Sequence, residues 1–119
     1  MKDVYSYKDL VVWQKSFELA RRVYALSGKL PKFEQYGLAS QLQRSAVSIP
    51  SNIAEGQQRN SSGEYKQFLG VAKGSSAELE TQLLLLKDVY GFDAGAELIL
   101  LGEVQKMLSA IVSKLSTSH

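Results

Sequence analysis

Apolar residues recur every three or four positions through almost the whole chain, and no long stretch alternates apolar and polar residues as a strand does. Only two prolines, Pro31 and Pro50, interrupt this pattern. Because helices repeat every 3.6 residues and strands every two, the pattern predicts an all-helical fold. The chain has 119 residues, 45% of them hydrophobic, which is enough for one domain with its own core. We therefore expect one all-α domain over residues 1–119, with a short N-terminal arm at 1–7.

Breaks in the periodicity divide the chain into four predicted helices, at about residues 8–27, 34–57, 61–90 and 93–119. Ser61 and Glu64 form a capping box at the start of the third helix, and Gly91 suits the position just after its end. Connections of about five residues make successive helices antiparallel neighbours. The predicted fold is an antiparallel, up-down-up-down four-helix bundle.

Pro50 lies inside the second predicted helix, which should kink there because proline lacks an N–H and its ring crowds the preceding turn. Small residues surround it, namely Ser45, Ala46, Ser48 and Ser51. The third helix carries Gly70 and Gly74, and glycine inside a helix costs about 1 kcal/mol relative to alanine. We expect this cost to be offset by close packing of the two glycines against the small residues near Pro50.

The residues that common enzyme mechanisms need are scarce. The chain has no cysteine, and its one histidine is His119. Cysteine nucleophiles, cysteine zinc sites and histidine-based triads are therefore excluded. Glu78 and Glu80 point to different faces of the predicted helix, and no glycine loop is followed by Lys and Ser or Thr. We expect no enzymatic activity, no metal, no cofactor and no small-molecule substrate.

The sequence shows neither a signal-peptide pattern nor a membrane-spanning stretch. The first residues lack the apolar stretch of a signal peptide, and the most apolar run, residues 83–86, is too short to cross a bilayer. A cytoplasmic protein without membrane contact is the expectation.

A polar segment surrounds the helix-interior proline and consists of Ser48, Pro50, Asn52, Glu55 and Gly56. Ser48, Asn52 and Glu55 share one helix face, at spacings of four and three. One interpretation is a hydrogen-bond network that satisfies backbone groups released by the proline and caps the helix end. The other makes Glu55 a general base, but the sequence offers it no partner.

Charge is distributed unevenly along the chain. Residues 1–73 contain eleven Lys or Arg against six Asp or Glu, whereas residues 74–119 contain three against six. Four basic residues spaced by seven form a row along the first helix: Lys8, Lys15, Arg22 and Lys29. Such a row can follow phosphates without reading bases. The candidate RNA or DNA contacts are Lys8, Lys15, Arg21, Arg22, Lys29, Lys32, Arg44 and Arg59. The alternative is a solvated face on which Lys15 and Arg22 pair with Glu18.

The chain also has more apolar surface than a small bundle can hide. The first helix carries two apolar stripes, one containing Trp13, Phe17 and Tyr24 and the other Val12, Leu19, Val23 and Leu26. Phe33 and Tyr36 flank the start of the second helix. Exposed apolar faces indicate self-association or a protein partner.

These segments together resemble the four-helix-bundle family of 23S rRNA intervening-sequence proteins, also called ribosomal-protein-like. The resemblance covers nearly the whole chain. It rests on the segments 9–15 (DLVVWQK), 36–42 (YGLASQL), 44–56 (RSAVSIPSNIAEG), 65–69 (YKQFL) and 74–83 (GSSAELETQL).

The resemblance implies an antiparallel four-helix bundle that assembles into a ring-shaped homopentamer. It also implies kinship with the accessory variability proteins of diversity-generating retroelements, which work with a reverse transcriptase and nucleic acid. Fold alone does not fix function. Two hypotheses follow: a homo-oligomeric bundle that binds RNA or DNA without sequence preference through a basic face, or a protein-interaction scaffold without nucleic-acid contact.

Overall fold

The computed structural model describes residues 6–117, and within that range it contains helices and no strand. The four long helices are α1 (Val11–Ser27), α2 (Leu38–Gln57), α3 (Ser62–Tyr90) and α4 (Gly95–Thr117). Two 3-10 helices, η1 (Tyr7–Asp9) and η2 (Lys32–Glu34), precede α1 and α2. The all-α prediction is confirmed. Residues 1–5 of the predicted arm and residues 118–119, including His119, lie outside the described range.

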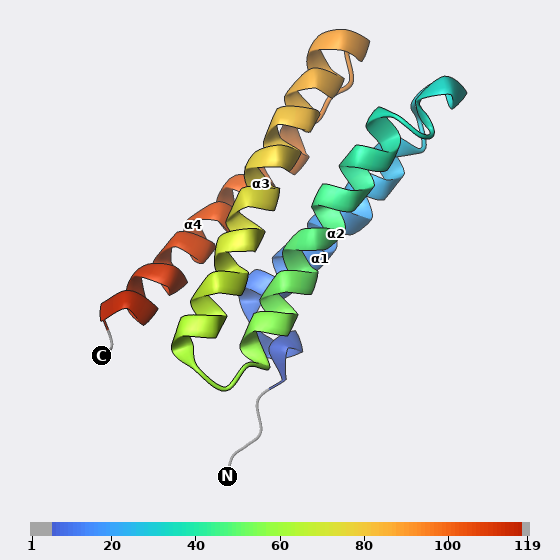
Figure 1. The fold of residues 1–119 in the computed structure, drawn as a ribbon. Coiled ribbons are helices and arrows are strands. Elements are labelled where there is room, and N and C mark those ends of the chain that lie inside the picture. Colours follow the sequence, from blue (N-terminus) through green and yellow to red (C-terminus); the bar gives the residue numbers. More distant parts are fainter. Residues whose placement is uncertain (1–5, 118–119) are drawn as a thin grey trace.

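Each helix packs against its neighbours in sequence, and α4 also packs against α1. Side-chain bonds between α2 and α3 run in opposite order along the two helices, since Ser45 pairs with Gln82 whereas Ser48 pairs with Ser75. The bundle measures 49 × 23 × 21 Å. In Figure 1, η1, the α2–α3 turn and the end of α4 lie at one end of the bundle. The α1–α2 and α3–α4 turns lie at the other end.

Local chemistry sets where the helices begin and end. The capping box of Ser6 and Asp9 is present, but it caps η1, so α1 starts only at Val11. The Ser61 hydroxyl accepts from the Glu64 N–H over 3.1 Å at the start of α3. Gly91 ends that helix with a φ of +70°, a left-handed conformation that favours glycine. The sequence predicts a second helix from about residue 34, but the α-helix becomes regular only at Leu38.

The core selects one of the two apolar stripes of α1. Val12, Leu19, Val23 and Leu26 are buried, whereas Phe17 and Tyr24 remain 47% and 49% exposed. On α4, Leu101, Val104 and Leu108 are fully or almost fully buried. The aromatic stripe of α1 therefore lies at the edge of the core, and Trp13 stacks there on Phe17 with ring centroids 5.0 Å apart.

Pro50 is buried, and α2 continues through it from Leu38 to Gln57. The kink inferred from the sequence stays a prediction.

The glycine at the close contact between α2 and α3 is Gly56, whereas the sequence suggested Gly70 and Gly74. Gly70 and Gly74 are exposed, and a Cβ on either would meet no heavy atom within 4 Å. The prediction that they pack against the small residues near Pro50 is wrong. Instead, a Cβ on Gly56 would lie 2.8 Å from the Phe68 Cβ and 3.3 Å from the Tyr65 carbonyl oxygen. Gly56 therefore sets the spacing of the two helices at this end.

One polar contact ties the α1–α2 turn to the end of α3. The Tyr90 hydroxyl donates to Glu34 Oε2 over 2.6 Å, and the Leu38 N–H donates to Oε1 over 3.0 Å. The bond from Tyr90, aided by the one from Leu38, lowers the pKa of Glu34 below its ordinary 4.5. The same bond from Tyr90, aided by desolvation, raises the pKa of Tyr90 above 10.0.

This contact predicts a pH-dependent contribution to stability. A carboxyl group whose pKa is lower in the folded state stabilises the fold above its unfolded-state pKa, and this stabilisation is lost in acid. A tyrosine whose pKa is higher in the folded state stabilises the fold below its unfolded-state pKa, and this stabilisation is lost in alkali. We expect Tyr90→Phe to lower the urea midpoint between about pH 4.5 and 10, the two ordinary pKa values, with the deficit shrinking at lower pH. Tyr36→Phe, on an exposed side chain, is the matched control. A deficit that is unchanged at pH 3 would contradict the assignment.

Candidate functional site

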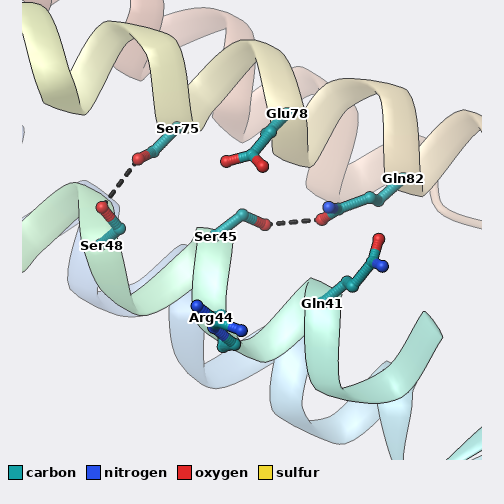
Figure 2. Close-up of a pocket in the computed structure, with 7 residues that line it drawn as sticks. All are labelled: Gln41, Arg44, Ser45, Ser48, Ser75, Glu78 and Gln82. Atoms are coloured by element: carbon teal, nitrogen blue, oxygen red, sulfur yellow. Dashed lines mark hydrogen bonds between the residues drawn. The ribbon is translucent and has the colours of Figure 1, made fainter. Parts of the chain in front are cut away.

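A polar groove of about 370 Å³ runs between α2 and α3. Figure 2 shows its lining: Gln41, Arg44, Ser45 and Ser48 from α2, and Ser75, Glu78 and Gln82 from α3. Gln41 comes from the segment 36–42, the other α2 residues come from the segment 44–56, and the α3 residues come from the segment 74–83. The fold thus brings three of the segments that carry the family resemblance to one place.

Hydrogen bonds cross the floor of this groove. The Ser45 hydroxyl donates to Gln82 Oε1 over 2.6 Å, and the hydroxyls of Ser48 and Ser75 lie 2.7 Å apart. Asn52 donates its amide to the Ser48 carbonyl and hydroxyl, over 2.7 and 3.0 Å. Ser45, Ser75 and Gln82 are buried, so their polar groups need hydrogen-bond partners inside the protein. The bonds of these three residues hold α2 to α3 in a part of the interface that is polar.

The rim of the groove carries opposite charges. Arg44 on α2 and Glu78 on α3 are both exposed, and no ion pair joins them. Together with the amides of Gln41 and Gln82, the lining offers donors and acceptors for hydrogen bonds. Within residues 6–117, no three His, Cys, Asp or Glu side chains lie close enough together to hold a metal ion.

The predicted polar segment divides between two roles. Ser48 and Asn52 belong to the groove network, which includes the Ser48 carbonyl. The carbonyl that loses its helical partner to Pro50 is that of Ala46, so the network does not replace the missing bond directly. Glu55 is exposed and pairs with Arg59 over 3.0 Å, away from this network.

Four of the eight basic candidates form ion pairs. Lys15 pairs with Glu103 on α4 over 2.8 Å, and Arg59 pairs with Glu55. Arg21 and Arg22 both pair with Glu18. The Arg59 guanidinium also lies 4.6 Å from the centre of the Phe68 ring. The pair that the sequence proposed between Lys15 and Glu18 is replaced by a contact between helices. All of these cations keep substantial exposure, so each pair contributes little to stability.

The other candidates are spread over the bundle. Lys8 lies in η1, and Lys29 follows α1, so only Lys15 and Arg22 of the predicted row belong to that helix. Arg44 lines the α2–α3 groove and a second groove with Tyr24 and Val47, whereas Lys15 faces α4. Lys32 lies in η2. The α-helix itself therefore carries only the two middle members of the predicted row, and phosphate contact by the row stays a prediction.

A feature that the sequence interpretation did not identify is the outer face of α3. Leu84, Leu85 and Val89 are exposed there within two helical turns, and Val71 is exposed thirteen residues before Leu84. We call Leu84, Leu85 and Val89 the α3 face. The stripe containing Leu79, Leu83 and Leu86 occupies the core, and in the sequence it conceals this second apolar set. Phe17, Tyr24 and Val47 form another exposed apolar surface, which we call the α1–α2 face.

No helix in the described part of the chain is long and apolar enough to cross a membrane.

The four-helix architecture, with a polar groove between α2 and α3, places the chain among small helical-bundle proteins. Comparison with known families identifies the class further. The family model described as 23S rRNA-intervening sequence protein matches residues 8–112. The chain belongs to this family, which confirms the resemblance seen in its sequence.

A crystal structure from Bacteroides thetaiotaomicron VPI-5482 is similar to this one. It is described as a protein with unknown function from the S23 ribosomal protein family. The TM-score is 0.77 and the sequence identity 27%, over 86% of this chain and 98% of that chain. No curated protein matches the chain.

Proposed function

We propose that the chain is a non-enzymatic, homo-oligomeric bundle, pentameric as the family resemblance implies, that binds RNA or DNA without sequence preference. The observation that carries the proposal is the pair of exposed apolar faces on different parts of one subunit. Large exposed apolar patches rimmed by polar residues are typical of interaction surfaces.

The two faces also differ in the charges beside them. Arg44 lines the same groove as Tyr24 and Val47 of the α1–α2 face. Asp88 and Lys87 both line a shallow pocket with Leu84 and Leu85 of the α3 face, so this face carries one charge of each sign. Apolar surface can therefore meet apolar surface while Arg44 meets Asp88. Because the two faces are different, each subunit would join the next head to tail, and a head-to-tail contact that closes makes a ring.

The nucleic-acid part of the proposal depends on the basic candidates outside ion pairs. Lys8, Lys29, Lys32 and Arg44 are exposed and form no ion pair within residues 6–117. Their charges are available to contact phosphates, and sequence-independent binding depends on such contacts. A ring would repeat this set in every subunit, so weak contacts would add through multivalency.

The test measures binding of a fluorescent RNA hairpin and a DNA duplex at several salt concentrations. We expect binding at low salt that weakens steeply as salt rises. Changing Lys8, Lys29, Lys32 and Arg44 to glutamine should flatten the salt dependence, by about one unit of log–log slope for each phosphate that the variant no longer neutralises. A matched variant replaces four lysines elsewhere: Lys66, Lys73, Lys106 and Lys114. Absence of binding at low salt, or equal effects of the two variants, would overturn the proposal.

The second candidate function is a protein-interaction scaffold. It is favoured by the ion pairs that engage four of the eight basic candidates and by the apolar α3 face. A defined protein partner retained after nuclease treatment, without binding to purified RNA or DNA, would select this alternative.

A further inference from the structure

The turn between α1 and α2, residues 28–37, exposes two aromatic side chains to an unusual degree. Phe33 is 79% exposed and Tyr36 is 90% exposed, more than any other large apolar side chain in the described part of the chain. The turn lies at the end of the bundle away from the end of α4 (Figure 1). Both rings are therefore accessible in the subunit.

The turn is held in place by bonds on both sides of these rings. The Glu34 carboxylate accepts from Tyr90 and from the Leu38 N–H. Within the turn, the Glu34 N–H donates to Pro31 and the Gly37 N–H donates to Glu34, each over 2.9 Å. Leu30 anchors the start of the turn in the core. A fixed backbone displays the rings without the entropy cost of ordering a flexible loop at each binding event.

The charges of the turn favour an anionic partner. Lys29 and Lys32 are exposed and take part in no ion pair within residues 6–117. Glu34, the one carboxylate of the segment, keeps its negative charge while it accepts from Tyr90, so residues 28–37 carry two positive charges and one negative charge. Asp93 borders Lys29 in a shallow pocket, and Lys32 lies next to Phe33 in the chain.

We propose that this turn is a stacking platform for single-stranded RNA or DNA. Unpaired bases would stack on Phe33 and Tyr36 while Lys29 and Lys32 contact the adjoining phosphates. Every base has a flat π-face, so aromatic platforms beside cations bind single strands with little sequence preference. Bases in a duplex are already stacked, so the platform discriminates against double strands. The inference rests on the proposed function and names where that function would reside.

The experiment uses a fluorescent oligouridine and a DNA duplex of equal length, with oligomeric mass checked by light scattering. The double variant Phe33→Leu/Tyr36→Leu keeps apolar surface but removes the aromatic faces. We expect it to bind oligouridine at least about fivefold more weakly, since stacking contributes about 1–3 kcal/mol per base, and to bind duplex unchanged. Phe33→Trp/Tyr36→Trp should restore binding. Lys29→Gln/Lys32→Gln should reduce the single-strand salt slope by about 1.4, whereas the control Lys106→Gln/Lys114→Gln should not.

The outcomes separate this inference from the proposed function. Wild-type binding that the leucine variant leaves unchanged overturns the platform and leaves nucleic-acid binding intact. Absence of any wild-type binding overturns both. If the leucine variant changes the oligomeric mass, or if the wild type binds anionic phospholipid vesicles and not oligouridine, the turn serves a second copy or a membrane surface, and the inference is wrong.

Discussion

Replacing Leu84 and Leu85 with glutamate is expected to split the assembly into monomers that stay folded. Both side chains are about half exposed in the subunit, so the change removes little from its core. If the α3 face is covered in the assembly, each interface loses two apolar side chains. Because each is already half buried in the subunit, the loss per side chain is about half of the ~1.5–3 kcal/mol that full burial contributes. The new carboxylates would lie near both Asp88 and Lys87, so the lost apolar burial dominates the effect.

Light scattering and far-UV circular dichroism measure mass and helicity together. The matched control places the same two charges on exposed positions of α4, as Ser109→Glu and Ser113→Glu, and should leave the mass unchanged. A charge swap refines the assignment: Arg44→Glu and Asp88→Arg should each weaken the assembly, and the double variant should restore part of it. A wild-type monomer, or glutamate variants of wild-type mass, would contradict the head-to-tail arrangement.

Substituting leucine for Gly56 is expected to destabilise the bundle by about 3 kcal/mol, the upper part of the usual range for overpacking. Even a Cβ at this position would come within 2.8 Å of the Phe68 Cβ, an atom next to the backbone of α3 that cannot rotate away. The larger side chain must therefore force α2 and α3 apart. Urea denaturation followed by circular dichroism measures the destabilisation.

Two other helical glycines provide the controls. Gly70→Ala and Gly102→Ala introduce a methyl group into open space. Each should stabilise the subunit by up to about 1 kcal/mol, because alanine has the higher helix propensity. If Gly56→Leu unfolds at the wild-type urea concentration, the close approach of α2 and α3 is not required for stability.

Much of the fold follows from short-range patterns. The stripe of Leu101, Val104 and Leu108 predicts the buried side of α4, and Ser61 and Gly91 mark the ends of α3 as expected. The sequence does not predict which of the two stripes of α1 is buried, because both are apolar. The positions of α2 and α4 decide that Val23 is buried and Tyr24 is exposed.

The candidate groove depends on pairings that are distant in the chain. Ser45 and Gln82 are 37 residues apart, and nothing local to either predicts their hydrogen bond. The same limit explains the misassigned glycines. Gly70 and Gly56 both lie inside helices, and only the packing of α2 against α3 distinguishes an open position from a crowded one. Lys15 likewise has a suitable acid nearby at Glu18 but pairs with Glu103.

The placement of the chain's described ends has a practical consequence for handling the protein. The start of η1 and the end of α4 lie at the same end of the bundle, opposite the α1–α2 turn (Figure 1). A tag or surface tether attached near either of them projects away from Phe33 and Tyr36. Sensor-chip immobilisation through such a tether therefore leaves the turn facing the flowing solution.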